Sequence, residues 1–187
     1  MQPKARLDHA AVIQAAADLA DAEGFDQLTL ASLAERLGVR VPSLYNHVSG
    51  LPGLRRDLVL LGSRELSARL ARATIGRAAD DAVVALAQAY RAFAREHPGL
   101  YAAAQRAPDP ADQEAQAAAR EVVEIVLAVL AAYSLQEETA IHAVRGLRSA
   151  LHGFVTLEAS GGFGIPLGLD ESFRRLIQML IRGLHQP

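Results

Sequence analysis

The segment Leu30–Val48, which reads LASLAERLGVRVPSLYNHV, most constrains how this chain can fold. Its first half places Leu33 and Leu37 on one face at helical spacing, and Gly38 follows where a left-handed backbone can end a helix. Pro42 then suits the first position of a second helix, because its φ is already helical and no N–H is needed there. Two short helices joined by a tight turn are therefore predicted, as in a helix-turn-helix motif.

The same stretch carries an unusual charge pattern. From Arg36 through Arg56 there are four arginines and one histidine but no Asp or Glu, in a chain whose formal net charge is −2. An acid-free surface is suited to lie against phosphates. Across residues 1–60, however, six basic residues stand against seven acidic ones. DNA affinity would therefore depend on where the charges are placed and not on net charge.

Hydrogen-bond donors follow the predicted turn, and they suit phosphate oxygens or base edges in a major groove. Thr29 is an expected N-cap that can also meet a phosphate. The candidate DNA-binding residues are Lys4, Arg6, Thr29, Arg40, Pro42, Ser43, Tyr45, Asn46, His47 and Arg55. Lys4 and Arg6 lie in an N-terminal arm, and two alternatives stay open for it: a minor-groove contact or a disordered tail.

These residues resemble the DNA-binding domain of the TetR family of transcriptional regulators. The resemblance rests on Leu33-Ala34-x-x-Leu37-Gly38-Val39, Leu44-Tyr45-x-His47-Val48, Glu23-Gly24-Phe25 and Leu28-Thr29-Leu30. It covers about residues 6–65 and implies a three-helix DNA-binding domain. Many relatives carry a lysine at the start of the next helix to grip the DNA backbone, whereas Leu51 and Pro52 stand there in this chain. Arg55 or Arg56 could take that role, or both could simply be solvated.

Composition favours an all-α fold, because alanine and leucine dominate and strand-length runs of β-branched residues are missing. Periodicity and capping residues predict helices between Asp8 and Gly24, over 30–37 and from Pro42, and a long helix over 54–73 after a bend at 49–53. Further helices are expected from Asp80-Asp81 to 96, from the break at His97–Tyr101 to 106, over 113–133 and over 135–160. A final helix, about 171–183, would be capped by Asp170 or Ser172.

Without cysteine the chain has no disulfides or thiolate metal sites, which fits a reducing cytoplasm. The longest apolar run, Ile125–Leu135, is too short to cross a bilayer, and the N-terminus lacks the apolar core of a signal peptide. We therefore expect a soluble cytoplasmic protein with no membrane partner and no cofactor.

The C-terminal portion resembles the WHG-type TetR regulatory domain. That resemblance rests on His97-Pro98-Gly99-Leu100-Tyr101, Leu151-His152-Gly153-Phe154 and Gly161-Gly162-Phe163-Gly164. The subgroup commonly has a tryptophan before its His-Gly pair, but this chain has no Trp, so pocket shape cannot be carried over. The expected domains are a helix-turn-helix domain with its arm at 1–50, a connecting helix at 51–76, and an effector-binding and dimerisation domain at 77–187.

Two further sites are predicted in the C-terminal portion. A small-molecule effector pocket would be lined by Tyr90, Phe93, His97, Tyr101, Gln105, Ile125, Val126, Val129, His152 and Phe163, an apolar wall with a few polar points. Homodimerisation through the last two helices would use Leu147, Leu151, Phe154, Val155, Leu157, Leu176, Ile177, Leu180, Ile181 and Leu184, which offer more apolar area than one bundle face needs. For any single residue in either set, ordinary core packing is the alternative.

The function predicted from these features is a repressor that binds a palindromic double-stranded operator as a dimer and is released by a small molecule. An adaptor or ligand-binding protein of the same fold without specific DNA binding is the alternative, which the near-neutral N-terminal domain permits. An enzyme is disfavoured. Glu138 and His142 lie one turn apart, but no Glu-x-x-His pair, phosphate loop or nucleophile elbow accompanies them, so no metal site is predicted.

Overall fold

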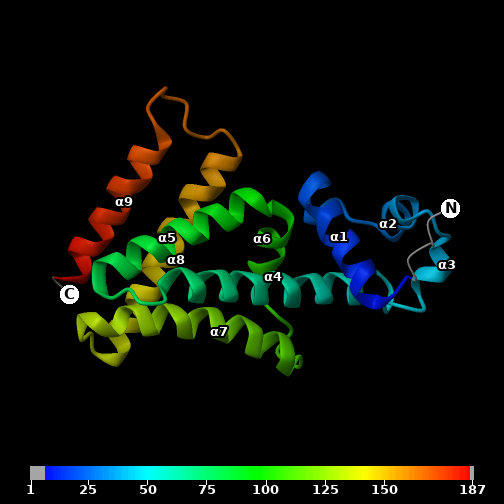
Figure 1. Ribbon diagram of the computed structural model, residues 1–187, viewed down its shortest axis with the longest axis horizontal. Helices are drawn as coiled ribbons and strands as arrows, with labels where there is room; N and C mark the ends of the chain where they lie inside the picture. Colours follow the sequence, from blue (N-terminus) through cyan, green and yellow to red (C-terminus); the bar gives the residue numbers. More distant parts are fainter. Residues whose placement is uncertain (1–6, 186–187) are drawn as a thin grey trace. The chain divides into compact units, whose positions relative to one another are not determined.

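The computed structural model describes residues 7–185, and helices build all of the regular structure in that range (Figure 1). The elements are α1 (His9–Glu23), η1 (Phe25–Gln27), α2 (Leu30–Leu37), α3 (Val41–Leu44), α4 (Gly50–Thr74), α5 (Ala79–Glu96), α6 (Pro98–Ala104), α7 (Gln113–Leu130), η2 (Ala131–Tyr133), α8 (Glu137–Ala159) and α9 (Leu169–Leu184). The all-α prediction is confirmed. None of the described helices is long and apolar enough to cross a membrane.

The chain divides into two compact units, each described by itself. The first comprises residues 1–64 and 97–119, and the second comprises residues 65–96 and 120–187. Both α4 and α7 contribute residues to each unit. The domain boundaries expected from the sequence, at residues 50 and 76, stay a prediction.

The first three helices begin and end on local signals. The Asp8 carboxylate accepts the Ala11 N–H at 2.8 Å and so caps α1. Thr29 caps α2 by accepting the Ser32 N–H at 3.0 Å, and the Ser32 hydroxyl accepts the Thr29 N–H at 3.2 Å. Gly38 ends α2 with a φ of 63°, a left-handed conformation that glycine adopts without strain. The two predicted N-caps and the predicted glycine stop are therefore confirmed.

A close contact fixes α6 against α1 within the first unit. The Asp21 carboxylate accepts the backbone N–H groups of Gly99 at 2.7 Å and Leu100 at 3.0 Å, and His97 Nδ1 lies 3.0 Å from the same carboxylate. A Cβ atom at Gly99 would collide with the backbone of Ala20, so only glycine permits this approach. Asp21 thus satisfies N–H groups at the start of α6 that have no partner within the helix, and it joins α6 to α1.

The core of the second unit lies where α5, α8 and α9 meet. Buried side chains of these three helices include Leu86, Leu151 and Phe173. An arginine, Arg91, is 8% exposed in this apolar setting. Its guanidinium donates to Glu158 at 2.5 and 2.8 Å and to Asp170 at 2.8 Å, and it lies over the rings of Phe154 and Phe173. Buried charges are tolerated when they are paired in this way.

Three predicted helix starts are wrong. The helix expected from Leu54 begins at Gly50, because that residue turns the chain with a φ of 71° and Pro52 fits the first turn, where no N–H is needed. Gly168, not Asp170 or Ser172, is the N-cap of α9, and the Ser172 hydroxyl donates to the Gly168 carbonyl instead. At the start of α5, Asp80 and Asp81 lie in the first helical turn, where their charge complements the helix dipole.

Candidate DNA-binding surface and ligand cavities

The short helix after the turn stands on a small apolar base in the first unit. Leu33 of α2, Leu44 of α3 and Val48 are buried, and the Val39 N–H donates to the Ala34 carbonyl at 3.0 Å to close the turn. Regular α-helix covers only Val41–Leu44, which is shorter than the sequence predicts. Tyr45–His47 continue as turns, since the N–H groups of His47 and Val48 both donate to the Leu44 carbonyl at 2.8 and 2.9 Å.

The predicted DNA-contacting side chains project from this base. Arg40, Pro42, Tyr45 and Asn46 are exposed, and the Tyr45 ring is 61% exposed. Ser43 and His47 are half-buried. The structure therefore brings six of the predicted residues into one short segment beside the turn.

Thr29 is exposed at the start of α2, where its hydroxyl already takes part in the capping box. Lys4 and Arg6, the two predicted residues of the arm, lie outside the described residues.

The two arginines at the start of α4 are both engaged with protein groups. Arg55 donates to the Asp26 carbonyl at 3.1 Å and lies 5.9 Å from the centre of the Phe25 ring. Arg56 donates to the carboxylates of Asp112 and Glu114, which raise the pKa of its guanidinium above the usual value. The predicted contact of Arg55 with DNA would have to form while Arg55 keeps its bond to Asp26 and its contact with Phe25.

The predicted pocket residues fall in both units. On α5, Tyr90 and Phe93 are buried; on α8, His152 is exposed; and the Phe163 ring lies 4.9 Å from that of Phe154. Ile125 and Val129 of α7 line a cavity of about 370 Å³ in the second unit, together with residues from the end of α4 and the start of α5. In the first unit, His97 precedes α6, Tyr101 is buried in it, and Gln105 follows it. Their assembly into one effector pocket stays a prediction.

The predicted dimer residues separate into two groups within the second unit. Six are buried inside the chain, where they hold α8 and α9 to their neighbours: Leu147, Leu151, Phe154, Val155, Ile177 and Ile181. Leu176 and Leu180 are half-buried. Met179, which the sequence analysis did not single out, is 65% exposed, and Leu157 is 46% exposed. The side chains available to a partner are therefore on the outer faces of these helices.

Two ionic clusters were missed by sequence reasoning. Arg91 could have been noticed, because it interrupts an apolar stripe on α5. At the start of the same helix, Asp80 accepts from the Tyr133 hydroxyl at 2.7 Å and lies 2.9 Å from His185 Nε2. The hydrogen bond from Tyr133 holds the pKa of Asp80 below its usual range, and burial raises that of Tyr133. No local signal connects Asp80 with a residue 105 positions away.

Within residues 7–185, no three metal-ligating side chains gather into a group that could hold an ion. The Glu138–His142 pair is 3.9 Å apart and solvent-exposed on α8.

A three-helix arrangement with an exposed helix-turn-helix and a run from Arg36 to Arg56 without acids, followed by further helices, is typical of a helix-turn-helix transcriptional regulator. Comparison with known proteins agrees. The family described as bacterial regulatory proteins, tetR family, matches residues 12–49, and the Tetracyclin repressor-like C-terminal domain matches residues 83–180. An uncharacterised HTH-type transcriptional regulator of Mycobacterium tuberculosis is 40% identical over 183 residues, which cover 97% of this chain and 84% of that protein. The chain belongs to the TetR family, a family of transcriptional regulators and not of enzymes.

Further relatives share the whole fold. An uncharacterised HTH-type transcriptional regulator of Bacillus subtilis is 38% identical over 98% of this chain and 96% of its own. A solved structure of a protein of unknown function from Rhodococcus sp. RHA1 has a TM-score of 0.82 at 24% identity, covering 99% of this chain and all of that one. A TetR variant from Acinetobacter baumannii AYE, solved in complex with minocycline, has a TM-score of 0.69 at 25% identity, with 97% and 98% covered.

Proposed function

We propose that the protein is a cytoplasmic repressor that binds a palindromic operator as a homodimer and leaves it when a small molecule binds. The observation that carries the proposal is the surface around α3, where Tyr45 is 61% exposed amid a run from Arg36 to Arg56 without any acid. Arg40 and Asn46, which both carry hydrogen-bond donors, are exposed in the same segment. Such a surface offers phosphate contacts and base contacts together.

The experiment is a gel-shift titration with the DNA upstream of the protein's own gene, repeated at several salt concentrations. A specific complex should weaken steeply with salt, with a slope of about −0.9 for every phosphate contact. Tyr45→Ala should weaken specific binding at least about fivefold by removing a contact of roughly 1 kcal/mol. Arg120→Met, which removes an exposed charge on α7, is the matched control and should bind normally.

No specific complex in that assay, or in selection from genomic fragments, would contradict the proposal. The protein would then be an adaptor or ligand-binding protein of the same fold. Equal affinity of wild type and the Tyr45→Ala variant would instead place the DNA contact elsewhere.

Dimerisation is proposed through the outer faces of α8 and α9. A groove of about 260 Å³ runs between them, lined by small and apolar residues including Ala143, Gly146, Leu180 and Gly183. Added Cβ atoms at Gly146 and Gly183 would meet nothing, so these positions leave room for a partner helix to approach closely. A symmetric dimer would place the two copies of α3, the proposed recognition helices, about 34 Å apart along the duplex.

Leu180→Arg tests the interface, since it places a charge in the middle of this groove. Light scattering should then give the mass of a monomer, while circular dichroism retains the helical signal. Arg182→Glu, a charge change at an exposed position two residues further along α9, is the control. If the Leu180→Arg variant stays dimeric, the dimer interface does not lie on α8 and α9.

Effector binding is proposed from the pocket residues predicted above and from the cavity beside Ile125 and Val129. The Acinetobacter relative, solved with minocycline, shows that this fold accommodates an organic ligand. A ligand that binds more tightly at one spacing of the two recognition helices would shift the dimer toward that spacing. Operator affinity measured with and without each compound that binds the protein tests this, and unchanged affinity with every one would contradict it.

A further inference from the structure

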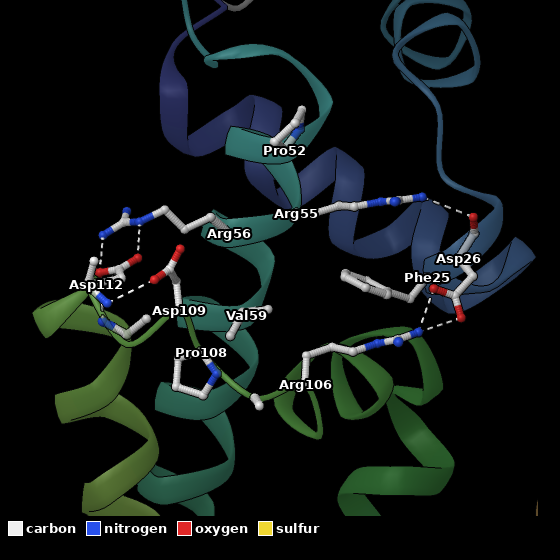
Figure 2. Close-up of a pocket in the computed structure, with 13 residues that line it drawn as sticks. Phe25, Asp26, Pro52, Arg55, Arg56, Val59, Arg106, Pro108, Asp109 and Asp112 are labelled. Atoms are coloured by element: carbon white, nitrogen blue, oxygen red, sulfur yellow. Dashed lines mark hydrogen bonds and ion pairs between the residues drawn. The ribbon is translucent and has the colours of Figure 1, made fainter.

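A second cavity, of about 620 Å³, lies within the first unit and is separate from the residues predicted to bind the effector. Its walls come from η1, the first turns of α4, the connection between α6 and α7, and the start of α7 (Figure 2). This volume is within the range of small-molecule sites. The cavity therefore has room for an organic ligand beside the helix-turn-helix.

One end of the cavity carries an excess of positive charge. Arg55 and Arg106 lie near opposite sides of the buried Phe25 ring, with their guanidinium carbons 5.9 and 5.6 Å from its centre. Both turn toward Asp26, as Figure 2 shows: Arg106 reaches its carboxylate at 2.6 Å, and Arg55 reaches only its backbone carbonyl at 3.1 Å. A single carboxylate thus faces two guanidinium groups.

Arg55 is the less satisfied of the two. It has no carboxylate partner among residues 7–185, and its Nε is buried with no hydrogen-bond acceptor. By contrast, Arg56 at the opposite end of the cavity is matched by Asp112 and Glu114. A buried donor with no acceptor is costly, and native structures usually supply one from water or a ligand.

Between the two ends the walls are mainly apolar. Pro52, Val59, Pro108, Ala111 and Ala115 are among the lining residues, and the one acid beside Val59, Asp109, accepts the Ala111 N–H at 2.8 Å. The site therefore offers the Arg55 guanidinium, which has no carboxylate partner among the described residues, and an apolar surface next to it. That combination suits a planar carboxylate attached to an apolar body, because guanidinium and carboxylate match in shape and can pair through two hydrogen bonds.

From this geometry we infer that the cavity binds a small organic carboxylate, whose anionic group meets Arg55 beside Phe25 and whose apolar part lies against Val59 and Pro108. The bound acid would bridge η1, α4 and the connection between α6 and α7. Because η1 joins α1 to α2, the bound acid would bias the position of the helix-turn-helix. That consequence rests on the proposed function, whereas the binding itself does not.

The test uses the whole protein without DNA and 1-naphthoate as the probe. Calorimetry should show one naphthoate bound per chain, and the arginine Nε–H signals in the nitrogen–proton NMR spectrum should shift. The neutral 1-naphthamide lacks the charge and acetate lacks the apolar body, so each should bind at least ~tenfold more weakly.

Two variants locate the site. Arg55→Met removes the charge at similar length and should weaken naphthoate binding at least ~tenfold, the size expected for a charge-assisted hydrogen bond. Val59→Trp fills the cavity without touching any charge and should weaken it as much. Arg120→Met, an exposed arginine outside the cavity, should bind as the wild type does. Circular dichroism confirms that each variant is folded.

Equal binding of the acid and its amide would overturn the inference, as would binding that persists in both Arg55→Met and Val59→Trp, since the acid would then lie elsewhere. Binding by inorganic phosphate as tight as by naphthoate would also overturn it, because the apolar walls would have no role. Failure of operator binding would leave these results unchanged, so the two proposals can fail separately.

Discussion

The surface around α3 and the junction of α5, α8 and α9 use arginine in opposite ways. Arg40 is exposed next to the turn, and no carboxylate or other acceptor pairs with its side chain among the described residues. Arg91 is buried, with two carboxylates and two aromatic rings around its guanidinium. The Arg40 charge is therefore open to an external partner, as the proposed phosphate contact requires, and the Arg91 charge holds helices together.

Both regions contain an arginine, so residue type alone does not distinguish the two uses. What differs is whether an acid lies close in space. No acid pairs with Arg40 among the described residues, whereas Glu158 comes to Arg91 from 67 positions away. An unmatched arginine therefore indicates an interface, and a matched one indicates internal structure.

Arg91→Met should have the largest effect on folding. It leaves the Glu158 carboxylate, whose side chain is 14% exposed, without its cation, and should lower the free energy of unfolding by about 3 kcal/mol. Chemical denaturation followed by circular dichroism measures the loss. Asp170→Asn is the control, because that side chain is 89% exposed and its pair contributes about 0.5 kcal/mol or less. A loss in Arg91→Met no greater than in Asp170→Asn would show that the buried pair adds nothing.

The Arg91–Glu158 pair should also make the free energy of unfolding depend on pH in the acid range. Hydrogen bonds from Arg91 hold the pKa of Glu158 below its ordinary value of 4.5. A lowered pKa means that the folded state favours the ionised form, so the contribution is complete above that value and is lost as pH falls through the lowered pKa. The difference in unfolding free energy between wild type and Glu158→Gln should therefore shrink as pH is lowered from about 6 to about 3. If the difference in unfolding free energy stays constant across that range, packing and not the charge of Glu158 accounts for it.

Arg40→Met is the counterpart test on the DNA side. Operator affinity should fall by about tenfold and the salt slope should become shallower by about 1, as for one lost phosphate contact. The free energy of unfolding should stay within about 0.5 kcal/mol of wild type, since an exposed side chain with no internal partner is removed. Denaturation and gel shift on the same preparation measure both. A stability loss like that of Arg91→Met would contradict the distinction between the two arginines.

Sequence reasoning succeeded where the signal is local. Asp8, Thr29 and Gly38 mark helix ends within a few residues of the groups they satisfy, and the all-α fold follows from periodicity. The predicted start of α4 is wrong because proline suits a bend and a first helical turn equally well, and Pro52 lies in the first turn.

What the sequence could not provide is long-range pairing. Asp21 accepts from Gly99 and Leu100, which are 78 and 79 positions away, and no local pattern predicts that meeting. The same holds for Arg55, predicted as a DNA contact, because only the fold brings it to Phe25 and Asp26. The effector, dimer and DNA contact residues stay predictions that the variants above can test one at a time.

Thr29 offers the smallest effect and the finest test of the comparison, because its one hydroxyl has an internal use and a proposed external one. Thr29→Ala removes the acceptor of the Ser32 N–H and should lower the free energy of unfolding by about 1 kcal/mol. Thr29→Ser keeps the hydroxyl and should preserve both stability and operator affinity. If Thr29→Ala loses operator affinity even at temperatures where it is fully folded, the residue also contacts phosphate. If affinity is retained there, the hydroxyl serves only to cap α2, and Thr29 belongs with Arg91 among the internally used groups.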